Sequence, residues 1–466
     1  MNEIRNELNE AQWEAVRYLD GPELVIAGAG SGKTRVLTYK IAFLLEHGMC
    51  PWNILALTFT NKAAREMRER IVRQVGEEKS RGLVMGTFHS VFARILRREA
   101  QAIGFNERFT IYDQDDSRSL VKTIIREMQL DEKKYTPKDV ANIISRAKER
   151  LLTPSAFRSD RQSTEAMQMA RMTSVGAIYE RYQERLRQSN AMDFDDLLMQ
   201  TYLLFQNNEE VRLRYVQKFQ YVLVDEYQDT NFAQHAIIRQ LTKENGRLCV
   251  VGDDAQSIYS FRGANIENIL KLEEVFPSLR IFKLEQNYRS TQNIVNAANS
   301  VIAKNRRQYE KKVFSTNDVG DPIYVLTTVS DLEEADVVVR KIAANHRNYA
   351  YRDMAILYRT NAQSRTFEEA MRRVRIPYRI YGGLSFYQRK EVKDVIAYCR
   401  VTVNPYDEEA LRRIINYPAR GIGNATLTRL SECAGVLGCG LWQVLLDMPP
   451  MLDVSAGAKK KLVAFR

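Results

Sequence analysis

The chain has 466 residues, of which 45% are hydrophobic and 27% charged, as is typical of a globular protein with buried cores. No apolar run is long enough to span a bilayer, the N-terminus lacks the pattern of a signal peptide, and the five cysteines are scattered and odd in number. These features argue against a membrane protein or a disulfide framework, and they predict a cytoplasmic protein of several domains. The formal net charge of +11 favours a polyanionic partner.

Short apolar segments alternate with helical patterns along most of the chain. The predicted strands are residues 24–27, 54–59, 83–85, 221–224, 248–251, 281–284, 323–326 and 354–358. A typical helical pattern follows Thr60, a candidate cap, with apolar residues recurring every four positions from Ala63 to Val75. This alternation predicts an α/β fold with a parallel sheet, whose ligands bind at the carboxyl ends of the strands. Residues 110–190 and the segment from 382 onward are helix-rich and interrupt the alternation.

Residues 24–34 (LVIAGAGSGKT) join a short apolar strand to a glycine-rich turn and the start of a helix. The glycines let the backbone direct its N–H groups inward, where they bind the phosphates of a nucleoside triphosphate. Lys33 is expected to reach the β- and γ-phosphates, and the Thr34 hydroxyl to bind Mg²⁺. The pattern is one residue short, because Ala27 stands where the strict motif has glycine. The residues expected to hold the nucleotide here are Ala27, Gly28, Ala29, Gly30, Ser31, Gly32, Lys33 and Thr34.

An apolar strand at 221–224 ends in two adjacent carboxylates, Asp225 and Glu226. Taken alone, such a pair is more simply an acidic helix cap. Together with a phosphate loop it predicts a hydrolytic site, in which Asp225 holds Mg²⁺ and Glu226 polarises the attacking water.

A series of motifs occurs in a fixed order along the chain. They are Gln12 in LNEAQ, AGAGSGKT (27–34), TFTNKAA (58–64), GTFHS (86–90), DFDDLL (193–198), VDEYQDTN (224–231), VGDDAQSIYSFRGA (251–264) and LEQNYRS (284–290). This set resembles the superfamily 1 DNA helicases of the UvrD/Rep/PcrA type, over nearly the whole chain. The resemblance implies an ATP-dependent, Mg²⁺-requiring helicase that moves 3′ to 5′ on single-stranded DNA and acts at junctions with duplex DNA.

The resemblance also implies a RecA-like P-loop NTPase domain and part of a second RecA-like domain, each with a helical insertion. The expected boundaries are 1–109 and 191–280 for the first RecA-like domain, 110–190 for its insertion, 281–381 for the second domain and 382–466 for an incomplete second insertion.

Several roles follow from the resemblance. Gln12 would read the adenine edge, with Arg35 and Tyr288 packing on the base. Gln256 and Arg289 would contact the γ-phosphate, where fixed polar groups stabilise the charge that develops during transfer. Tyr259 and Phe261 lie three and five residues beyond Gln256, so a shift of this segment on hydrolysis would move the surfaces that hold the bases.

The expected DNA contacts combine aromatic rings for stacking with polar side chains for phosphates, as a motor that grips any sequence requires. The residues are Thr58, Phe59, Asn61, Thr87, His89, Phe194, Tyr259, Phe261 and Arg262. Related helicases often have tryptophan at the position of Phe261, so stacking there is expected to be weaker.

Residues 418–426 (PARGIGNAT) resemble the hairpin of helix-hairpin-helix modules. Gly421 and Gly423 would present backbone N–H groups to a duplex phosphate, with Arg412, Arg413 and Arg420 nearby. The alternative is a tight turn between helices that requires two glycines.

Relatives also carry a T-x-H-x-x-K-G-L-E segment and a T-R-A segment whose arginine reaches the γ-phosphate, and neither string occurs here. We therefore expect the chain to correspond to the N-terminal part of a helicase, and to bind ATP and DNA but turn over weakly. An arginine of this kind contributes ~10³–10⁵ in rate to other nucleotide hydrolases.

Two other classes stay open: a non-catalytic ATP- and DNA-binding fragment or regulatory protein, and a P-loop kinase, although no acceptor site of the kinase type is visible. DNA-repair and replication proteins are candidate partners, and the motor motifs do not distinguish among repair, replication and recombination.

Overall fold

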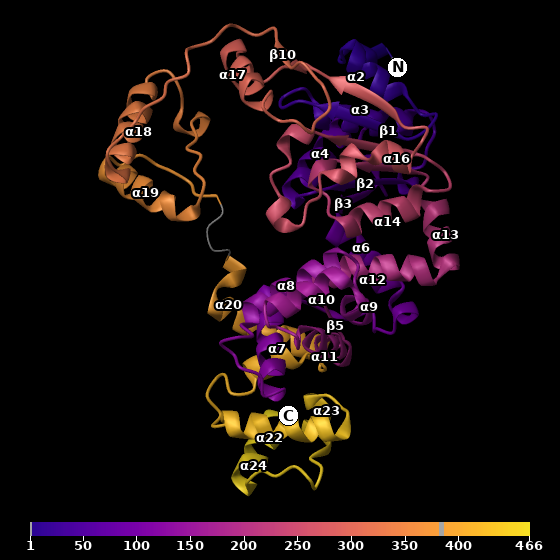
Figure 1. Cartoon of the computed structure of the whole chain (residues 1–466), viewed down its shortest axis with the longest axis vertical. Helices are drawn as coiled ribbons and strands as arrows, with labels where there is room; N and C mark the ends of the chain where they lie inside the picture. Colours follow the sequence, from indigo (N-terminus) through magenta and orange to yellow (C-terminus); the bar gives the residue numbers. More distant parts are fainter. Residues whose placement is uncertain (1, 382–385) are drawn as a thin grey trace. The chain divides into compact units, whose positions relative to one another are not determined.

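The computed structural model describes residues 2–381 and 386–466 (Figure 1). The chain divides into two compact units. Unit 1 comprises Met1–Gly320 and Arg400–Arg466, and unit 2 comprises Asp321–Cys399. In the described part of the chain, no helix has both the length and the apolar character needed to cross a membrane.

Unit 1 is built on a six-stranded parallel sheet in the order β3-β2-β6-β7-β1-β8. Its strands are β1 (Glu23–Ala27), β2 (Ile54–Thr58), β3 (Val84–Thr87), β6 (Tyr221–Val224), β7 (Leu248–Gly252) and β8 (Arg280–Leu284). Six of the predicted strands are thereby confirmed, as is the parallel α/β fold. β1 lies in the interior of the sheet, with Leu24 opposite Val250 on one side and Ile281 on the other.

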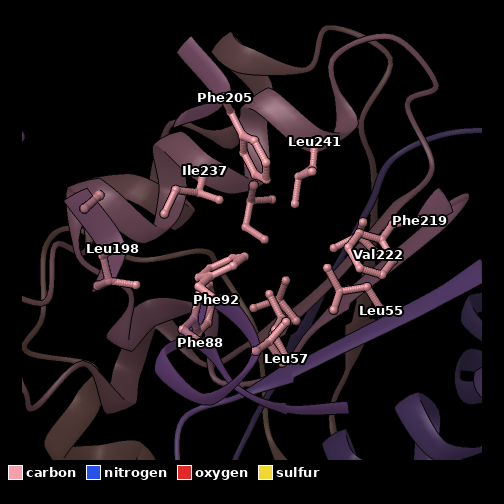
Figure 2. Close-up of a cluster of buried hydrophobic side chains, with 14 of the residues drawn as sticks. Leu55, Leu57, Phe88, Phe92, Leu198, Phe205, Phe219, Val222, Ile237 and Leu241 are labelled. Carbon is pink, nitrogen blue, oxygen red and sulfur yellow. The ribbon is translucent and has the colours of Figure 1, made fainter. Parts of the chain in front are cut away.

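Alternate residues of each strand pack into two hydrophobic cores, one on each face of the sheet. Leu55, Leu57 and Val222 belong to the core drawn in Figure 2, whereas Ala56 and Leu223 belong to the core on the opposite face. Because side chains alternate along a strand, a strand buried on both faces is apolar throughout. This explains why the predicted strands read as continuous apolar runs.

Helices cover both faces. One core is closed by α2 (Glu10–Arg17), α3 (Lys33–Glu46) and α4 (Asn61–Val75). The other is closed by α6 (Phe88–Arg98), α12 (Phe194–Asn207), α13 (Glu209–Lys218), α14 (Phe232–Thr242), α15 (Glu267–Leu270) and α16 (Leu272–Val275). The hydroxyl of Thr60 accepts a hydrogen bond from the N–H of Ala63, so the predicted cap of α4 is confirmed. The shorter helices α1 (Asn2–Asn6) and α5 (Glu77–Ser80) complete this part of unit 1.

Residues 110–190 are rich in helices, as predicted. The helices are α7 (Gln114–Glu127), α8 (Pro137–Glu149), α9 (Pro154–Ser159), α10 (Arg161–Met169) and α11 (Val175–Gln188), and they lie between the paired short strands β4 (Thr110–Tyr112) and β5 (Ala191–Asp193). Lys148, whose side chain is fully buried, joins this helical region to the sheet domain by ion pairs of 2.7 Å to Asp193 and 2.8 Å to Asp196.

The C-terminal part of the described chain is helical, as predicted; residues 382–385 of that prediction lie outside the described residues. Its helices are α20 (Lys390–Val403), α21 (Glu408–Ile414), α22 (Asn424–Leu437), α23 (Leu441–Asp447) and α24 (Ala456–Phe465). Within unit 1, Arg400 pairs with Asp116 and Asp407 at 2.8 Å each, and Arg185 pairs with Glu408 at 2.7 Å. These ion pairs attach residues 400–414 to the helices of residues 110–190.

One prediction about the later part of the chain is wrong in this structure. The predicted strands at 323–326 and 354–358 are not strands, and among the described residues of unit 2 no strand is formed, so these segments have no partner strand. Unit 2 instead contains the helices α18 (Asp331–Asn345) and α19 (Ser364–Arg373) and the larger part of α20.

The boundary expected at residue 281 between two RecA-like domains stays a prediction. β8 completes the first sheet beside β1, and α17 (Gln292–Ile302) and the short pair β9 (Gln286–Asn287) and β10 (Phe314–Ser315) also belong to unit 1. Residues 281–320 therefore lie with the first sheet, because the apolar strand at 280–284 finds its hydrogen-bonding partner there.

Candidate nucleotide and nucleic-acid site

The phosphate loop connects the carboxyl end of β1 to the first turn of α3. Gly30 and Gly32 adopt φ values of +70° and +90°, a region that side chains disfavour, and Gly32 directly precedes the first helical residue, Lys33. The Ser31 hydroxyl donates to the carbonyl of Gly28 at 2.7 Å and closes the turn. The loop thus has the backbone that the sequence predicted for a phosphate cradle.

Donors from outside the loop fix its carbonyl groups. Gln12 Nε2 donates to the carbonyl of Ser31 at 3.0 Å, Asn287 Nδ2 to that of Ala29 at 2.6 Å, and the Tyr288 N–H to that of Gly30 at 3.0 Å. A phosphate loop that is already held in its binding conformation loses less conformational entropy when a ligand binds. Asn287 was not among the predicted residues, although its position inside LEQNYRS was a signal for it.

The three residues expected to contact the adenine lie near the phosphate loop, but they differ in their exposure and in their bonding partners. Gln12 is only 2% exposed, and its amide oxygen Oε1 accepts from the N–H of Asn9 in a capping box, so its side chain supports α2 and the loop. The Tyr288 hydroxyl, on a ring that is 47% exposed, accepts from Asn9 Nδ2 at 2.7 Å. Arg35 lies 3.5 Å from Glu7 and over the Tyr39 ring. Their contact with a base stays a prediction.

The two carboxylates follow β6, next to the phosphate loop. Lys33 Nζ lies 4.0 Å from Glu226 Oε2, and the N–H of Asp225 donates to the carbonyl of Leu57 on β2. Glu226 has φ +51° and ψ +48°, a left-handed conformation that costs on the order of 1 kcal/mol for a residue with a side chain. Such strain is typical of functional positions, and here it accompanies a side chain directed at the loop lysine.

Asp225 is a buried carboxyl group close to Glu226 and Lys33. Burial and the neighbouring Glu226 raise the pKa of Asp225 to about 7, although Lys33 opposes the shift. A buried carboxylate without full compensation favours a bound cation. The described residues contain no cluster of three His, Cys, Asp or Glu side chains suited to a metal. Mg²⁺ bound with a nucleotide needs only one or two protein ligands. Its binding by Asp225 and Thr34 stays a prediction.

Gln228, which was not among the predicted site residues, links the Glu226 carboxylate to Asp253 at the end of β7. Its Nε2 donates to Glu226 Oε2 at 2.9 Å, and its Oε1 accepts from the N–H of Asp253 at 3.0 Å. A Cβ atom at Gly252 would lie 2.8 Å from the Gln228 oxygen, so this link requires glycine there. The signal for Gln228 was its place within DEYQDT, between the carboxylates and the helix α14.

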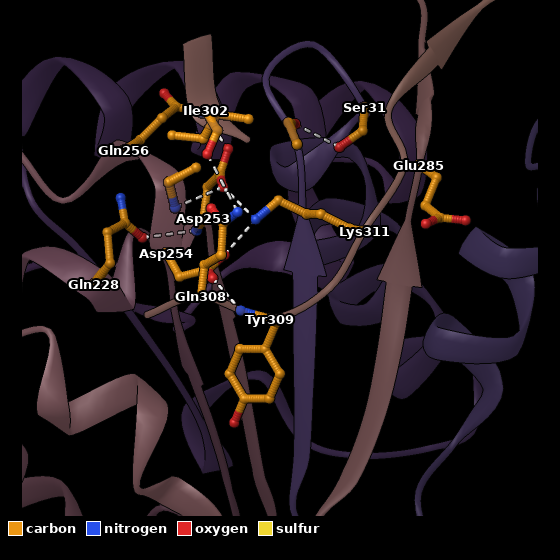
Figure 3. A network of polar contacts seen from close by, with 12 residues as sticks. Ser31, Gln228, Asp253, Asp254, Gln256, Glu285, Ile302, Gln308, Tyr309 and Lys311 are labelled. Atoms are coloured by element: carbon orange, nitrogen blue, oxygen red, sulfur yellow. Dashed lines mark hydrogen bonds and ion pairs between the residues drawn. The ribbon is translucent and has the colours of Figure 1, made fainter. Parts of the chain in front are cut away.

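The two residues expected at the γ-phosphate come from different segments. Gln256 Nε2 donates to Asp253 Oδ2 at 2.6 Å, so its amide is directed at its own turn (Figure 3). Arg289 is exposed, and its backbone lies against the phosphate loop: a Cβ at Gly30 would be 2.7 Å from Arg289 Cβ. Arg289 is therefore beside the loop, while Gln256 would have to change partners to bind a phosphate.

An aromatic row lies at the ends of β2 and β7. The ring of Tyr259 is 5.1 Å from that of Phe59 and 6.0 Å from that of Phe261, and Arg262 lies over both Tyr259 and Phe261. Phe261 is 68% exposed. Exposed rings next to a cation suit stacked bases and phosphates of a single strand. The structure thus brings together four of the predicted DNA contacts.

A second pair of predicted residues, His89 and Phe194, lies with ring centroids 5.8 Å apart, and Phe194 is 51% exposed. Burial lowers the pKa of His89 to about 4, so the ring is neutral at pH 7 and acts through hydrogen bonds or contact. Asn61 is exposed at the start of α4, and Thr87 caps α6. The prediction for Thr58 is not supported: its side chain is 1% exposed at the end of β2, because the strand is buried on both faces.

The glycine hairpin at 418–426 is held by its neighbours. Asn416 Oδ1 accepts from the N–H groups of Arg420 and Ile422, and the Arg420 guanidinium donates to the carbonyl of Ile414 at 2.8 Å. Arg420 therefore stabilises the end of α21. Gly421 has φ +70° and its carbonyl accepts from Lys461, whereas Gly423 caps the start of α22 in open space. The turn interpretation explains Gly421, and a phosphate contact at Gly423 stays a prediction.

Known proteins resemble this chain along nearly all of its length. A profile of the UvrD/REP helicase N-terminal domain matches residues 8–277, and one of the UvrD-like helicase C-terminal domain matches residues 282–446.

The chain is 44% identical to the ATP-dependent DNA helicase PcrA of Leuconostoc citreum over 461 residues, which cover 98% of this chain and 61% of that protein. It is 46% identical to PcrA of Staphylococcus epidermidis over 467 residues, covering 100% of this chain and 63% of that one. It is also 46% identical to PcrA of Staphylococcus aureus over 436 residues, covering 93% and 59%. The chain spans about three fifths of the length of these relatives. It belongs to the UvrD/REP helicase family.

Proposed function

We propose that this chain couples hydrolysis of ATP to 3′-to-5′ movement on single-stranded DNA and to opening of duplex at junctions. One observation carries the proposal. The carboxyl ends of neighbouring parallel strands bring Lys33 and the Asp225–Glu226 pair to the same edge of the sheet as the aromatic row of Phe59, Tyr259 and Phe261, of which Phe261 is exposed. The relatives named above are called ATP-dependent DNA helicases, which agrees with this combination.

In the proposed reaction, Glu226 accepts a proton from the water that attacks the γ-phosphate. Lys33 and Arg289 stabilise the negative charge on the transferred group. Mg²⁺ held by Asp225 and Thr34 would neutralise charge on the phosphate oxygens. Gln228, which binds the Glu226 carboxylate at 2.9 Å, keeps that side chain oriented toward the water.

Movement on DNA is proposed to start at Gln256. When the amide exchanges Asp253 for a γ-phosphate, the 254–256 turn shifts, and the rings of Tyr259 and Phe261 shift with it. If Gln256→Ala left both ATP hydrolysis and its stimulation by DNA intact, this coupling would be excluded.

Turnover by the 466 residues is proposed to be low. The predicted strands at 323–326 and 354–358, which a second RecA-like sheet would need, have no partner strand among the described residues. A role in DNA repair, replication or recombination, partners from those processes and a cytoplasmic location stay predictions.

The test is ATP hydrolysis by the purified chain with and without an oligo(dT) strand. We expect measurable hydrolysis that DNA stimulates, and loss of it in Lys33→Ala. Duplexes with a 3′ or a 5′ single-stranded tail test direction, because only the 3′-tailed substrate should be opened. Binding of ATP and DNA without any single-turnover hydrolysis would favour the alternative, a non-catalytic binding protein.

A further inference from the structure

Residues 309–315, here called the bridging segment, contact both sides of the candidate nucleotide site. Val313 packs against the phosphate loop: a Cβ atom at Gly28 would lie 2.6 Å from Val313 Cγ2. The N–H of Tyr309 donates to Asp254 Oδ2 at 2.5 Å, at the turn that carries Gln256. The segment is fixed to the sheet edge by Lys283, whose Nζ donates to the carbonyl of Glu310 at 2.7 Å. The bridging segment, which belongs to unit 1, therefore connects the phosphate loop to the turn that carries Gln256.

Lys311 is the charged contact of this segment with the turn. Figure 3 shows its side chain extending to Asp253 and Asp254, and its Nζ lies 3.1 Å from Asp253 Oδ1 and pairs directly with Asp254 Oδ1. The side chains of Lys311, Asp253 and Asp254 are 7%, 3% and 0% exposed. Two adjacent buried carboxylates repel each other strongly where water is scarce, so their arrangement depends on this cation.

Asp253 links Lys311 to Gln256. One carboxylate oxygen, Oδ1, contacts Lys311 and accepts from the N–H of Ala255 at 3.1 Å, while the other, Oδ2, accepts from Gln256 Nε2. The backbone of Asp253 in turn donates to Gln228, which binds the Glu226 carboxylate. A continuous set of polar contacts thus runs from the hydrolytic carboxylate to the bridging segment.

We propose that Lys311 is a positioning residue that acts through Asp253 on Gln256, and so determines how strongly the DNA-facing segment responds to the nucleotide. Without the cation, the two carboxylates repel each other and the γ-phosphate, so the turn that presents the Gln256 amide loosens. The amide is then no longer positioned to exchange Asp253 for the phosphate, and the DNA-facing segment responds less to the nucleotide. This inference rests on the proposed function, because it assigns Lys311 to the same ATP-driven cycle.

The test compares Lys311→Met with Lys312→Met in the full 466-residue chain. Lys312 is adjacent and exposed, so its substitution removes the same charge from the segment without touching the turn. The primary measurement is the ratio of kcat with oligo(dT) to kcat without it. We expect Lys311→Met to lower this ratio at least about fivefold, the low end of couplings between two sites. Lys312→Met should leave it unchanged, and Lys311→Arg, which keeps the charge, should restore most of it.

Hydrogen exchange of the backbone supplies a measurement that does not need activity. In Lys311→Met we expect faster exchange in residues 253–263 and unchanged exchange in residues 24–34. If the unsubstituted chain shows no hydrolysis, the proposed function fails while this measurement still decides the role of Lys311.

Three results would overturn the inference. They are an unchanged stimulation ratio in an active chain, unchanged exchange at 253–263, and faster exchange throughout the sheet, which would make Lys311 a structural residue only.

Discussion

Two regions of this chain carry the same alternation of apolar segments and helices, and only one of them forms a sheet. In unit 1, residues 24–27 lie between two parallel strands and are fully buried. In unit 2, the comparable segments form no strand, and Val325 is 89% and Leu357 94% exposed, although Ile356 packs against the small core of the unit. The helices α18 and α19 form nevertheless and share a small core that includes Val339 and Phe367. A helix satisfies its hydrogen bonds within itself, whereas a strand needs a neighbour.

This difference determines where the residues proposed to act on ATP lie. Each residue proposed to act on ATP follows a strand of the paired sheet or lies against the phosphate loop. We expect substitutions in the paired sheet to change activity and stability strongly, and substitutions in the unpaired segments to change them little. The expected effects run from the largest to the smallest.

The largest effect is expected at the hydrolytic carboxylate. Glu226→Gln keeps the shape of the side chain but removes the proton acceptor, so kcat should fall by ~10²–10⁴ while ATP binding is retained. Steady-state hydrolysis and binding of a fluorescent ATP analogue measure the two quantities. Glu210→Gln, at an exposed surface carboxylate, is the control. Equal losses of kcat in both variants would contradict the role of Glu226.

A core substitution tests the comparison directly. Leu223→Ala, in the buried strand β6, should lower the free energy of unfolding by about 2–5 kcal/mol, whereas Leu357→Ala should change it by less than ~0.5 kcal/mol. Denaturant titration of the two variants measures the difference. A large effect at Leu357 would mean that residues 354–358 are paired and buried in solution.

Unit 1 also buries an ionisable group whose charge opposes folding. Burial raises the pKa of Glu409 from 4.5 to about 7, and its Oε1 has no hydrogen-bond partner among the described residues. A carboxyl group with a raised pKa in the folded state stabilises the fold fully below the pKa of the unfolded chain. That stability is lost as the pH rises through 7.

Glu409→Gln should therefore raise the free energy of unfolding at pH 8 by on the order of 2–3 kcal/mol, and far less at pH 5. Unfolding curves at the two pH values measure this. Glu369→Gln, at an exposed glutamate of unit 2, should show no such pH dependence. A gain from Glu409→Gln that is equal at both pH values would exclude ionisation as its cause.

The smallest effect is expected in DNA affinity. Phe261→Ala should weaken binding of oligo(dT) and of mixed-sequence single strands alike by about 1–3 kcal/mol, because stacking depends little on the base. Trp52, which is also exposed but precedes the amino end of β2, provides the control Trp52→Ala. Fluorescence anisotropy measures both. A loss confined to one base type would instead indicate readout of sequence.

Much of the candidate site could be predicted because its residues lie in short contiguous motifs. The phosphate loop formed as expected, and Phe59, Tyr259, Phe261 and Arg262 came together because parallel strands deliver their following loops to one edge. Lys311 could not be predicted, because it lies 57 positions from Asp254 and no local pattern marks it. Thr58 was predicted to contact DNA, but its side chain is buried in this structure. A motif does not reveal which of its side chains face the core.

The sequence by itself determined the family, the parallel α/β fold of the first domain, the phosphate loop and its paired carboxylates, since these depend on local residue types and spacing. The tertiary structure alone decided that β8 joins the first sheet, that residues 323–326 and 354–358 remain unpaired, and that Asp253 is shared between Gln256 and Lys311. These features depend on hydrogen bonds and ion pairs between residues far apart in the chain, whose partners are chosen only when the chain folds.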